Sequence, residues 1–257
     1  MKKIKTMVLL SLLLIVGGQM MGQTRAAMLI GASMPWKDFA EFDGFNEFAL
    51  SSENAVYGGA GVGFNVGLKW YFNVGVKGLD IMLSVDGLYN GPNETLKTAY
   101  RNKEGGFVNE YVEGSFIYNS TPKYLNVPAM LGVNYMYYFN PQFAVYFEAG
   151  AGGNLHLITK KETVGEMIIS EVETKVRTIQ DYDATFSFAY QAGLGIEVAK
   201  NLIIGCSYYN LGSAPVKGQE VIRRTILSES TTKVESNYRT FGTVQPIMFL
   251  GRIGFRF

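Results

Sequence analysis

Apolar residues recur at every second position along much of the chain. From residue 62 to residue 72, the even-numbered positions are Val, Phe, Val, Leu, Trp and Phe, whereas the odd-numbered positions are Gly, Asn, Gly, Lys and Tyr. A period of two places these two sets on opposite faces of a β-strand. The pattern therefore predicts a strand with one strongly apolar face.

Six further segments repeat this alternation: 79–86, 125–135, 143–152, 186–197, 202–208 and 247–257. If the sheet is to close with an even number of strands, an eighth strand must exist, and we place it, with a weaker pattern, at about 25–33. The fold class that follows is all-β: an eight-stranded, antiparallel, up-and-down barrel.

Such alternation is compatible with a soluble barrel and with a membrane barrel. A soluble barrel has its apolar face inside, whereas a membrane barrel has its apolar face outside, against lipid. The apolar faces of the seven clear strands carry no Asp, Glu, Lys or Arg, and the opposite faces are rich in Gly, which suits a crowded interior. Connections are short on one side (73–78, 140–142 and 200–201) and long on the other (34–60, 91–122, 159–184 and 212–243). Short periplasmic turns and long extracellular loops are typical of outer-membrane barrels, so the sequence favours lipid.

The N-terminal segment 1–22 has the form of a secretory signal peptide. Lys2, Lys3 and Lys5 precede an apolar run at 7–16, which is followed by two glycines. A run of about ten residues is too short to cross a bilayer as a helix. We therefore predict cleavage near Gly22, export, and a barrel domain at 23–257 in the outer membrane of a Gram-negative bacterium.

Composition argues against several kinds of site. The 257 residues include one Cys and one His, which excludes a disulfide framework and a Cys-rich or multi-histidine metal site. A formal net charge of +1 gives no reason to expect a nucleic-acid partner. No Ser stands two positions from His156, and no Gly-rich stretch has phosphate-binding spacing. We expect no catalytic residues, no cofactor and no metal, and hence no enzyme.

Charged residues fall on the predicted inner faces. Eight strands leave an interior that side chains just fill, and charges in such a space must be paired and hydrogen-bonded. We therefore predict an ion-pair network centred on Lys69, Glu148, Glu197 and Arg252. Further charges on these faces are Asp80, Asp86 and Arg256. We interpret this network as a plug that rigidifies the barrel, and a gated solute path is the alternative.

Two segments resemble parts of known outer-membrane proteins. Phe255 and Phe257 resemble the terminal aromatic signal read by the barrel assembly machinery of Gram-negative bacteria. Tyr124-Leu-Asn-Val-Pro128, followed by Leu131 and Tyr135, is similar to the tyrosine–proline strand of the PorT-like outer-membrane β-barrel family of Bacteroidetes. The resemblance implies a small eight-stranded barrel of the OmpA and OmpX type, with membrane lipid and the assembly machinery as partners. It implies no catalytic residues.

The long loops are where function is expected, because rigid scaffolds commonly carry their binding residues on exposed connections. Aromatic residues stand at every third position at Trp36, Phe39, Phe42, Phe45 and Phe48. These rings either cover the barrel mouth and the outer lipid interface or form a platform for a ligand or protein.

Two other loop segments, 171–178 and 232–239, alternate like strands. They predict hairpins that carry the sheet above the membrane, with edges able to accept a partner strand. The leading functional expectation is a non-enzymatic envelope or surface barrel that binds macromolecules through its loops. The alternatives are an accessory subunit of an envelope complex, such as a PorT-like secretion component, and a narrow solute channel.

Overall fold

The computed structural model describes residues 24–41, 56–103, 105–108, 112–169 and 172–257. The predicted signal peptide at 1–22 and the aromatic residues Phe42, Phe45 and Phe48 lie outside this part of the chain.

Eight strands form a closed barrel in the order β1-β15-β12-β11-β8-β7-β4-β3. Every neighbouring pair in it is antiparallel. The strands are β1 (Thr24–Trp36), β3 (Gly63–Asn73), β4 (Leu79–Asn90), β7 (Tyr124–Asn140), β8 (Phe143–Ile158), β11 (Thr185–Val198), β12 (Leu202–Asn210) and β15 (Ile247–Arg256). The predicted eight-stranded antiparallel barrel is therefore confirmed, including the weak strand near the N-terminus.

The apolar residues of the barrel strands face outward. Leu68 and Leu131 are 42% and 62% exposed, whereas their neighbours Lys69 and Met130 are each 1% exposed. On the other barrel strands too, apolar residues point outward, and the inward positions are buried and often polar. The predicted assignment of the two faces is confirmed with one exception, since Ile247 at the start of β15 is buried.

Pro128 lies inside β7 without ending it. Proline has no backbone N–H and so cannot donate to a neighbouring strand. The ladder to β8 continues through Pro128. The ladder to β4 is interrupted there, between the pairs Val85–Ala129 and Leu88–Asn126. The missing donor thus coincides with a gap in the pairing on one side of the strand.

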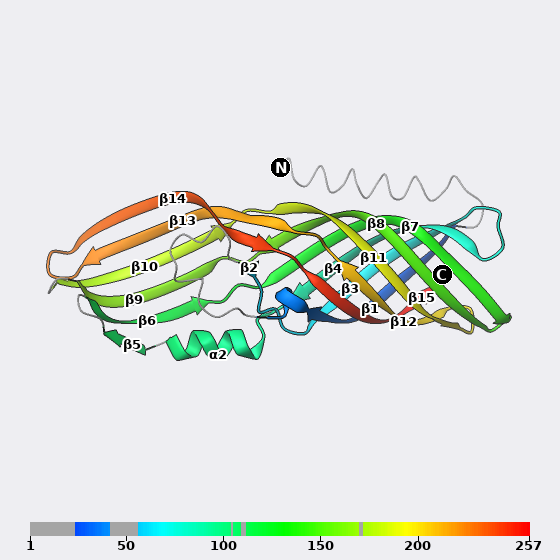
Figure 1. Cartoon of the computed structure of the whole chain (residues 1–257), viewed down its shortest axis with the longest axis horizontal. Helices are drawn as coiled ribbons and strands as arrows, with labels where there is room; N and C mark the ends of the chain where they lie inside the picture. Colours follow the sequence, from blue (N-terminus) through cyan, green and yellow to red (C-terminus); the bar gives the residue numbers. More distant parts are fainter. Residues whose placement is uncertain (1–23, 42–55, 104, 109–111, 170–171) are drawn as a thin grey trace.

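A second sheet extends from one end of the barrel, and we call it the outer sheet (Figure 1). Its seven strands have the order β2-β14-β13-β10-β9-β6-β5. They are β2 (Val56–Tyr57), β5 (Gly105–Val108), β6 (Val112–Ser120), β9 (Lys161–Ile169), β10 (Val172–Tyr182), β13 (Ala214–Ile226) and β14 (Thr231–Val244). A 3-10 helix, η1 (Lys37–Phe39), follows β1, and helix α2 (Glu94–Lys103) precedes β5. No helix among the described residues is long and apolar enough to cross a membrane.

The outer sheet continues the barrel wall. Strands β6, β9, β10, β13 and β14 connect to β7, β8, β11, β12 and β15 through two or three residues each, and they keep the same lateral order. The hairpins predicted from 171–178 and 232–239 are confirmed as β9–β10 and β13–β14. The segments 159–184 and 212–243 are consequently mostly strand, not loop. Helix α2 and strands β5 and β6 were not predicted.

The other end of the barrel carries the short connections, and we call it the turn end. Strands β3 and β4, β7 and β8, and β11 and β12 are joined there by 74–78, 141–142 and 199–201. The C-terminus lies at this end, away from the outer sheet (Figure 1). The predicted asymmetry between short and long connections is confirmed.

Candidate functional site

Four charged side chains from four strands meet in the barrel interior, and we call them the central network. Lys69 of β3 donates a hydrogen bond to Glu148 of β8. Arg252 of β15 contacts two acids: its Nη1 lies 3.0 Å from Asp86 Oδ1, and its Nη2 lies 3.2 Å from Glu148 Oε1. All four residues are at most 5% exposed. Two cations thus face two carboxylates, which balances the charge of the central network.

Two neutral residues of β12 complete the hydrogen bonding of Arg252. Its Nη2 donates to Ser207 Oγ at 2.7 Å, and its Nη1 donates to Tyr209 Oη at 3.2 Å. Tyr209 in turn donates to Asp86 Oδ2 at 2.8 Å. A buried charge is tolerated when it is paired and hydrogen-bonded, and Arg252 meets both conditions.

Glycine makes room for the acids of the central network. A Cβ atom on Gly67 would lie 2.0 Å from Asp86 Oδ1, and one on Gly193 would lie 2.8 Å from Glu148 Oε1. Neither position can carry a larger side chain unless the carboxylate moves. The Gly-rich inner faces therefore reflect crowding in the interior, as the sequence indicated.

Glu197 and Arg256 do not belong to the central network, although the sequence grouped them with it. Arg256 Nη1 pairs with Glu197 Oε2 at 2.5 Å near the turn end. Register explains the separation: Glu197 lies opposite Ala144, four residues along β8 from Glu148, and four residues of a strand span roughly 13 Å. A further ion pair, Arg25–Asp80 at 2.5 Å, lies at the same end of the barrel, and sequence reasoning did not identify Arg25.

An apolar cluster fills the barrel where it meets the outer sheet. Phe39 of η1 is 1% exposed, and its ring centroid lies 5.1 Å from that of Tyr124. The hydroxyl of Tyr124 donates to the carbonyl of Gly58 at 2.7 Å. This hydrogen bond holds the backbone at Gly58 against the cluster. Other members are Leu88, Met130, Tyr182, Leu211, Phe241 and Leu250. Buried apolar side chains and the central network thus both occupy the barrel interior.

Trp36 and Phe39 have different environments. Trp36 is 46% exposed on the outer surface of the barrel, where its ring lies 5.1 Å from that of Phe249. Phe39 is buried in the apolar cluster, so it is not accessible to a partner. Phe39 therefore packs in the barrel mouth, whereas the exposed ring of Trp36 fits either interpretation of this aromatic row.

His156 lies in the interior in contact with a serine. Its Nε2 is 2.6 Å from Ser187 Oγ, and its Nδ1 is 2.8 Å from Asn126 Oδ1. The Ser187 hydroxyl donates to the carbonyl of Leu211, and both Ser187 and His156 are buried. A hydroxyl engaged in this way is not presented to a substrate. Among the described residues, no group of three or more His, Cys, Asp or Glu side chains is placed to hold a metal ion.

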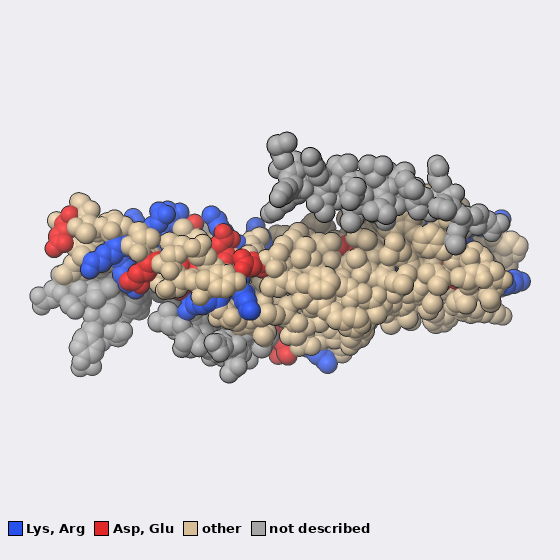
Figure 2. Space-filling model, turned by 90° about the horizontal axis from the view of Figure 1, so that it is seen from above, with Lys and Arg blue, Asp and Glu red and all other residues tan. Residues whose placement is uncertain are grey.

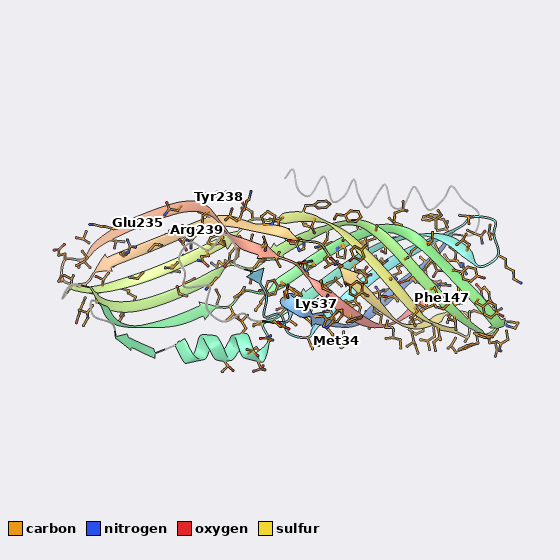
Figure 3. The ribbon with its side chains drawn as sticks, viewed as in Figure 1. Met34, Lys37, Phe147, Glu235, Tyr238 and Arg239 are labelled. Carbon is orange, nitrogen blue, oxygen red and sulfur yellow. The ribbon has the colours of Figure 1, made fainter. Side chains whose placement is uncertain are left out.

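Charged side chains gather on the surface of the outer sheet. On the face shown in Figure 2, Lys, Arg, Asp and Glu gather over the outer sheet and at the turn end, and other residues form most of the barrel surface between them. Pairs such as Arg177–Glu162 at 2.9 Å join neighbouring outer strands. Exposed apolar and aromatic side chains, including Val234 and Tyr238, lie among them; Figure 3 places Tyr238 on the outer sheet and Phe147 on the barrel.

No family model matches the chain, and no curated protein does either. Similar solved structures include Ail, the attachment invasion locus protein of Yersinia pestis, at 16% identity over 92% of this chain and 100% of that one, with a TM-score of 0.35. The outer membrane protein OprG of Pseudomonas aeruginosa matches at 11% identity over 92% and 97%, with a TM-score of 0.37. Neisserial surface protein A matches at 11% identity over 91% and 94%, with a TM-score of 0.34. Likeness at this level assigns the chain to no family.

Proposed function

We propose that the protein is a non-enzymatic, non-conducting barrel of the outer membrane of a Gram-negative bacterium, and that it displays the outer sheet as a platform for binding a macromolecule. The single observation that carries this proposal is the continuation of five adjacent barrel strands into the outer sheet. Five connections of only two or three residues allow less movement than long loops, so they keep the outer sheet close to the barrel mouth.

The outer surface of the barrel supports the membrane assignment. Large apolar side chains on different strands are more than half exposed there, among them Leu131, Phe147 and Leu194. Soluble monomers rarely expose contiguous apolar patches larger than a few hundred Å². Contact with lipid acyl chains carries no free-energy penalty for such a surface. The lack of charged residues on it also suits a bilayer, because a Lys or Arg side chain at the midplane would destabilise the barrel by about 2–4 kcal/mol.

The occluded interior supports binding outside the barrel over transport through it. The central network and the apolar cluster around Phe39 occupy the space that a solute would need. On the face shown in Figure 2, charged side chains gather over the outer sheet and at the turn end, and few lie on the barrel surface between them. The surface suited to a water-soluble partner is therefore the outer sheet.

Electrical recording tests the occluded interior. We expect the folded protein, inserted into a planar lipid bilayer, to show no steady unitary conductance, because paired charges and apolar packing block the path. A heat-denatured sample is the control for artefacts of protein addition. Reproducible conductance steps from the folded sample alone would contradict the proposal and favour the narrow-channel alternative.

Site-specific photo-crosslinking on intact cells tests the platform. A photoreactive amino acid would replace Val234 on the outer sheet or, as the matched control, Val76 in a turn at the opposite end; both side chains are more than half exposed. We expect a discrete macromolecular adduct from position 234 and none from position 76. Adducts from position 76 alone would contradict the platform and favour an accessory subunit of a periplasmic complex, which the PorT-like resemblance suggests. The absence of adducts at both positions would also contradict it.

A further inference from the structure

Strand β14 forms a long edge of the outer sheet, and Figure 1 shows it along the upper border of that sheet. On one side it pairs with β13, and on the other side β2 pairs with it only at Thr243 and Val244. No other described strand pairs with that second side, so it is an edge from residue 231 to residue 242. Residues 231–238 are accordingly all exposed. Such an edge presents a row of backbone N–H and C=O groups that a further strand can bind.

This edge lacks most of the features that protect edge strands. Natural edges are commonly short, interrupted by proline or a bulge, or lined with lysine. The strand at the opposite border of the sheet, β5, has only 4 residues. In β14, residues 231–240 contain no proline, and the register shift in the ladder to β13 falls between Thr240 and Gly242. The edge is therefore regular from residue 231 to residue 240, with Lys233 as its one lysine.

The charges along the edge are incompletely paired. Lys233 and Glu235 stand two residues apart, so they lie on the same face of the strand. Arg224 of β13 lies directly opposite Lys233 and donates a hydrogen bond to Glu235. Lys233 forms no ion pair with any described residue. Like charges directly opposite one another destabilise a sheet. Lys233 thus has a cation on its β13 side and needs a carboxylate on its open side.

A second copy of β14 supplies that carboxylate in one register. When a strand pairs antiparallel with its own copy, residues equally far from the central position lie opposite one another. With Val234 at the centre, Lys233 of each copy lies opposite Glu235 of the other copy. A centre at 233 or 235 would set identical charges opposite each other, and a centre at 236 would set Lys233 opposite Arg239. Of the centres from 233 to 237, only Val234 gives Lys233 a carboxylate.

The direction of β14 decides where the second copy must be anchored. The strand starts at the tip of the outer sheet and runs back towards the barrel (Figure 1). Two copies in one membrane carry this strand in the same direction, whereas antiparallel pairing needs opposite directions. Copies in two membranes that face each other meet this condition. Since the strand from Val234 to Val244 spans roughly 33 Å at the usual rise, the two barrels stay well apart.

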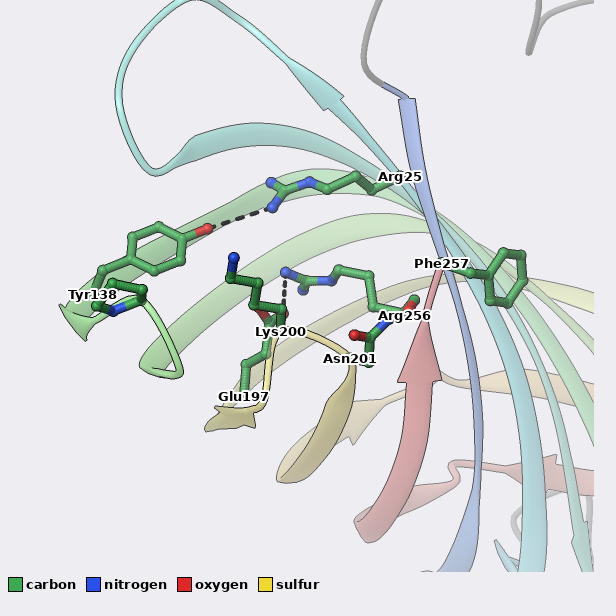
Figure 4. Close-up of a pocket in the computed structure, with 8 residues that line it drawn as sticks. Arg25, Tyr138, Glu197, Lys200, Asn201, Arg256 and Phe257 are labelled. Atoms are coloured by element: carbon green, nitrogen blue, oxygen red, sulfur yellow. Dashed lines mark hydrogen bonds and ion pairs between the residues drawn. The ribbon is translucent and has the colours of Figure 1, made fainter.

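The turn end of the barrel offers no comparable edge among the described residues. Its strands are joined in pairs by short turns. Figure 4 shows the pocket at that end, where Arg256 lies beside Glu197. Arg256 pairs with Glu197, and Arg25 pairs with Asp80. The contact between two copies therefore falls to the outer sheet.

We propose that β14 pairs antiparallel, about Val234, with β14 of a second copy in a facing membrane, so that the protein links two cell surfaces. This inference rests on the proposed function and names the macromolecule that the platform binds. The contact covers residues 231–237 of each copy, and so short a pairing belongs with the weak interfaces that bury less than about 1,200 Å². Many copies in each membrane act together, and multivalency turns weak contacts into stable adhesion.

The test measures aggregation of lipid vesicles that carry the folded protein, by light scattering. The variants are Lys233→Glu and Glu235→Lys, each of which sets like charges opposite each other when it pairs with itself. In a mixture of the two, every charge at 233 and 235 again lies opposite the other sign. The matched control is Lys217→Glu, which changes an exposed lysine of β13 outside the pairing.

Two further readouts keep the comparison sound. Gel mobility before and after boiling reports whether each variant is folded. Labelling of Lys217→Cys by a membrane-impermeant maleimide, in a Cys206→Ser background, reports whether the outer sheet faces outward. A different dye in each vesicle population shows which populations enter the same aggregates. Vesicles of Glu235→Lys mixed with Lys217→Glu carry opposite changes of net charge, so they control for general attraction.

We expect wild-type and Lys217→Glu vesicles to aggregate, and vesicles of either edge variant alone to aggregate at least about tenfold more slowly. Mixing Lys233→Glu with Glu235→Lys vesicles should restore aggregation that contains both dyes. Lys217→Glu vesicles should not recruit Glu235→Lys vesicles.

Three results would overturn the inference. They are unchanged aggregation of Glu235→Lys vesicles, no recovery in the mixture of the two folded edge variants, and no aggregation of wild-type vesicles with the outer sheet outward. If wild-type vesicles stayed dispersed while position 234 gave a photo-crosslinked adduct with a different macromolecule, self-pairing would be wrong and the proposed platform would stand.

Discussion

Replacing Arg252 by Met is expected to lower the free energy of unfolding by about 3–5 kcal/mol, the usual cost of removing one partner from a buried ion pair. Arg252 contacts both acids of the central network. Without it, Asp86 keeps only the hydroxyl of Tyr209 as a donor among these side chains, whereas Glu148 keeps Lys69. The loss therefore arises mainly from an uncompensated carboxylate at Asp86.

The measurement is urea-induced unfolding in lipid vesicles, followed by gel mobility without boiling. Arg223→Met is the matched control, because Arg223 is exposed on the outer sheet and should change stability by less than about 0.5 kcal/mol. Adding Asp86→Asn to Arg252→Met should recover part of the loss, since it removes the orphaned charge. Equal stability of Arg252→Met and Arg223→Met would show that the central network is not a buried charge cluster.

Replacing Leu131 by Arg is expected to destabilise the barrel by about 2–4 kcal/mol in a bilayer, the cost of Arg on the lipid face at the midplane. Leu131 lies near the middle of β7, paired with Leu83 and Ala151, and its side chain points outward. The substitution adds no steric conflict with the interior. The effect thus reports on the medium around the barrel.

Val234→Arg is the control for this substitution. Val234 is 58% exposed, close to the 62% of Leu131, but it belongs to the outer sheet. We expect a change within about 0.5 kcal/mol at this position in the same urea titration, because the side chain remains in water. If both substitutions had the same small effect, the barrel surface would be in water and the membrane assignment would fail.

The barrel could be predicted from the sequence because an apolar outer surface around a filled interior imposes a strict alternation on each strand. An apolar residue such as Leu131 must alternate with inward residues such as Met130 and Gly132, so the period of two is clear. The outer sheet is under no such rule. In β13, Val221, Ile222, Arg223 and Arg224 follow one another, so the alternation is broken there, although it is kept in the segments 171–178 and 232–239.

The central network could be predicted in composition but not in its pairings. Lys69, Glu148 and Arg252 follow from alternation, since each stands on an inward position. Which acid meets which base depends on strand register, and alternation alone does not fix register. Glu197 was misplaced for this reason. The inward position of Tyr209 could have been predicted from the sequence. The period of two that places Cys206 on the outer face of its strand places Tyr209 on the inner face.

Tryptophan quenching by brominated lipid tests the central claim, a barrel with its apolar surface in lipid, most directly. The chain has two tryptophans, Trp36 and Trp70. Both belong to outward positions of barrel strands. Trp36→Phe and Trp70→Phe give single-tryptophan proteins that can be folded into vesicles with brominated acyl chains. We predict strong quenching of each tryptophan relative to unbrominated vesicles. Unchanged fluorescence from both, with the folded protein recovered in the aqueous phase, would contradict the account.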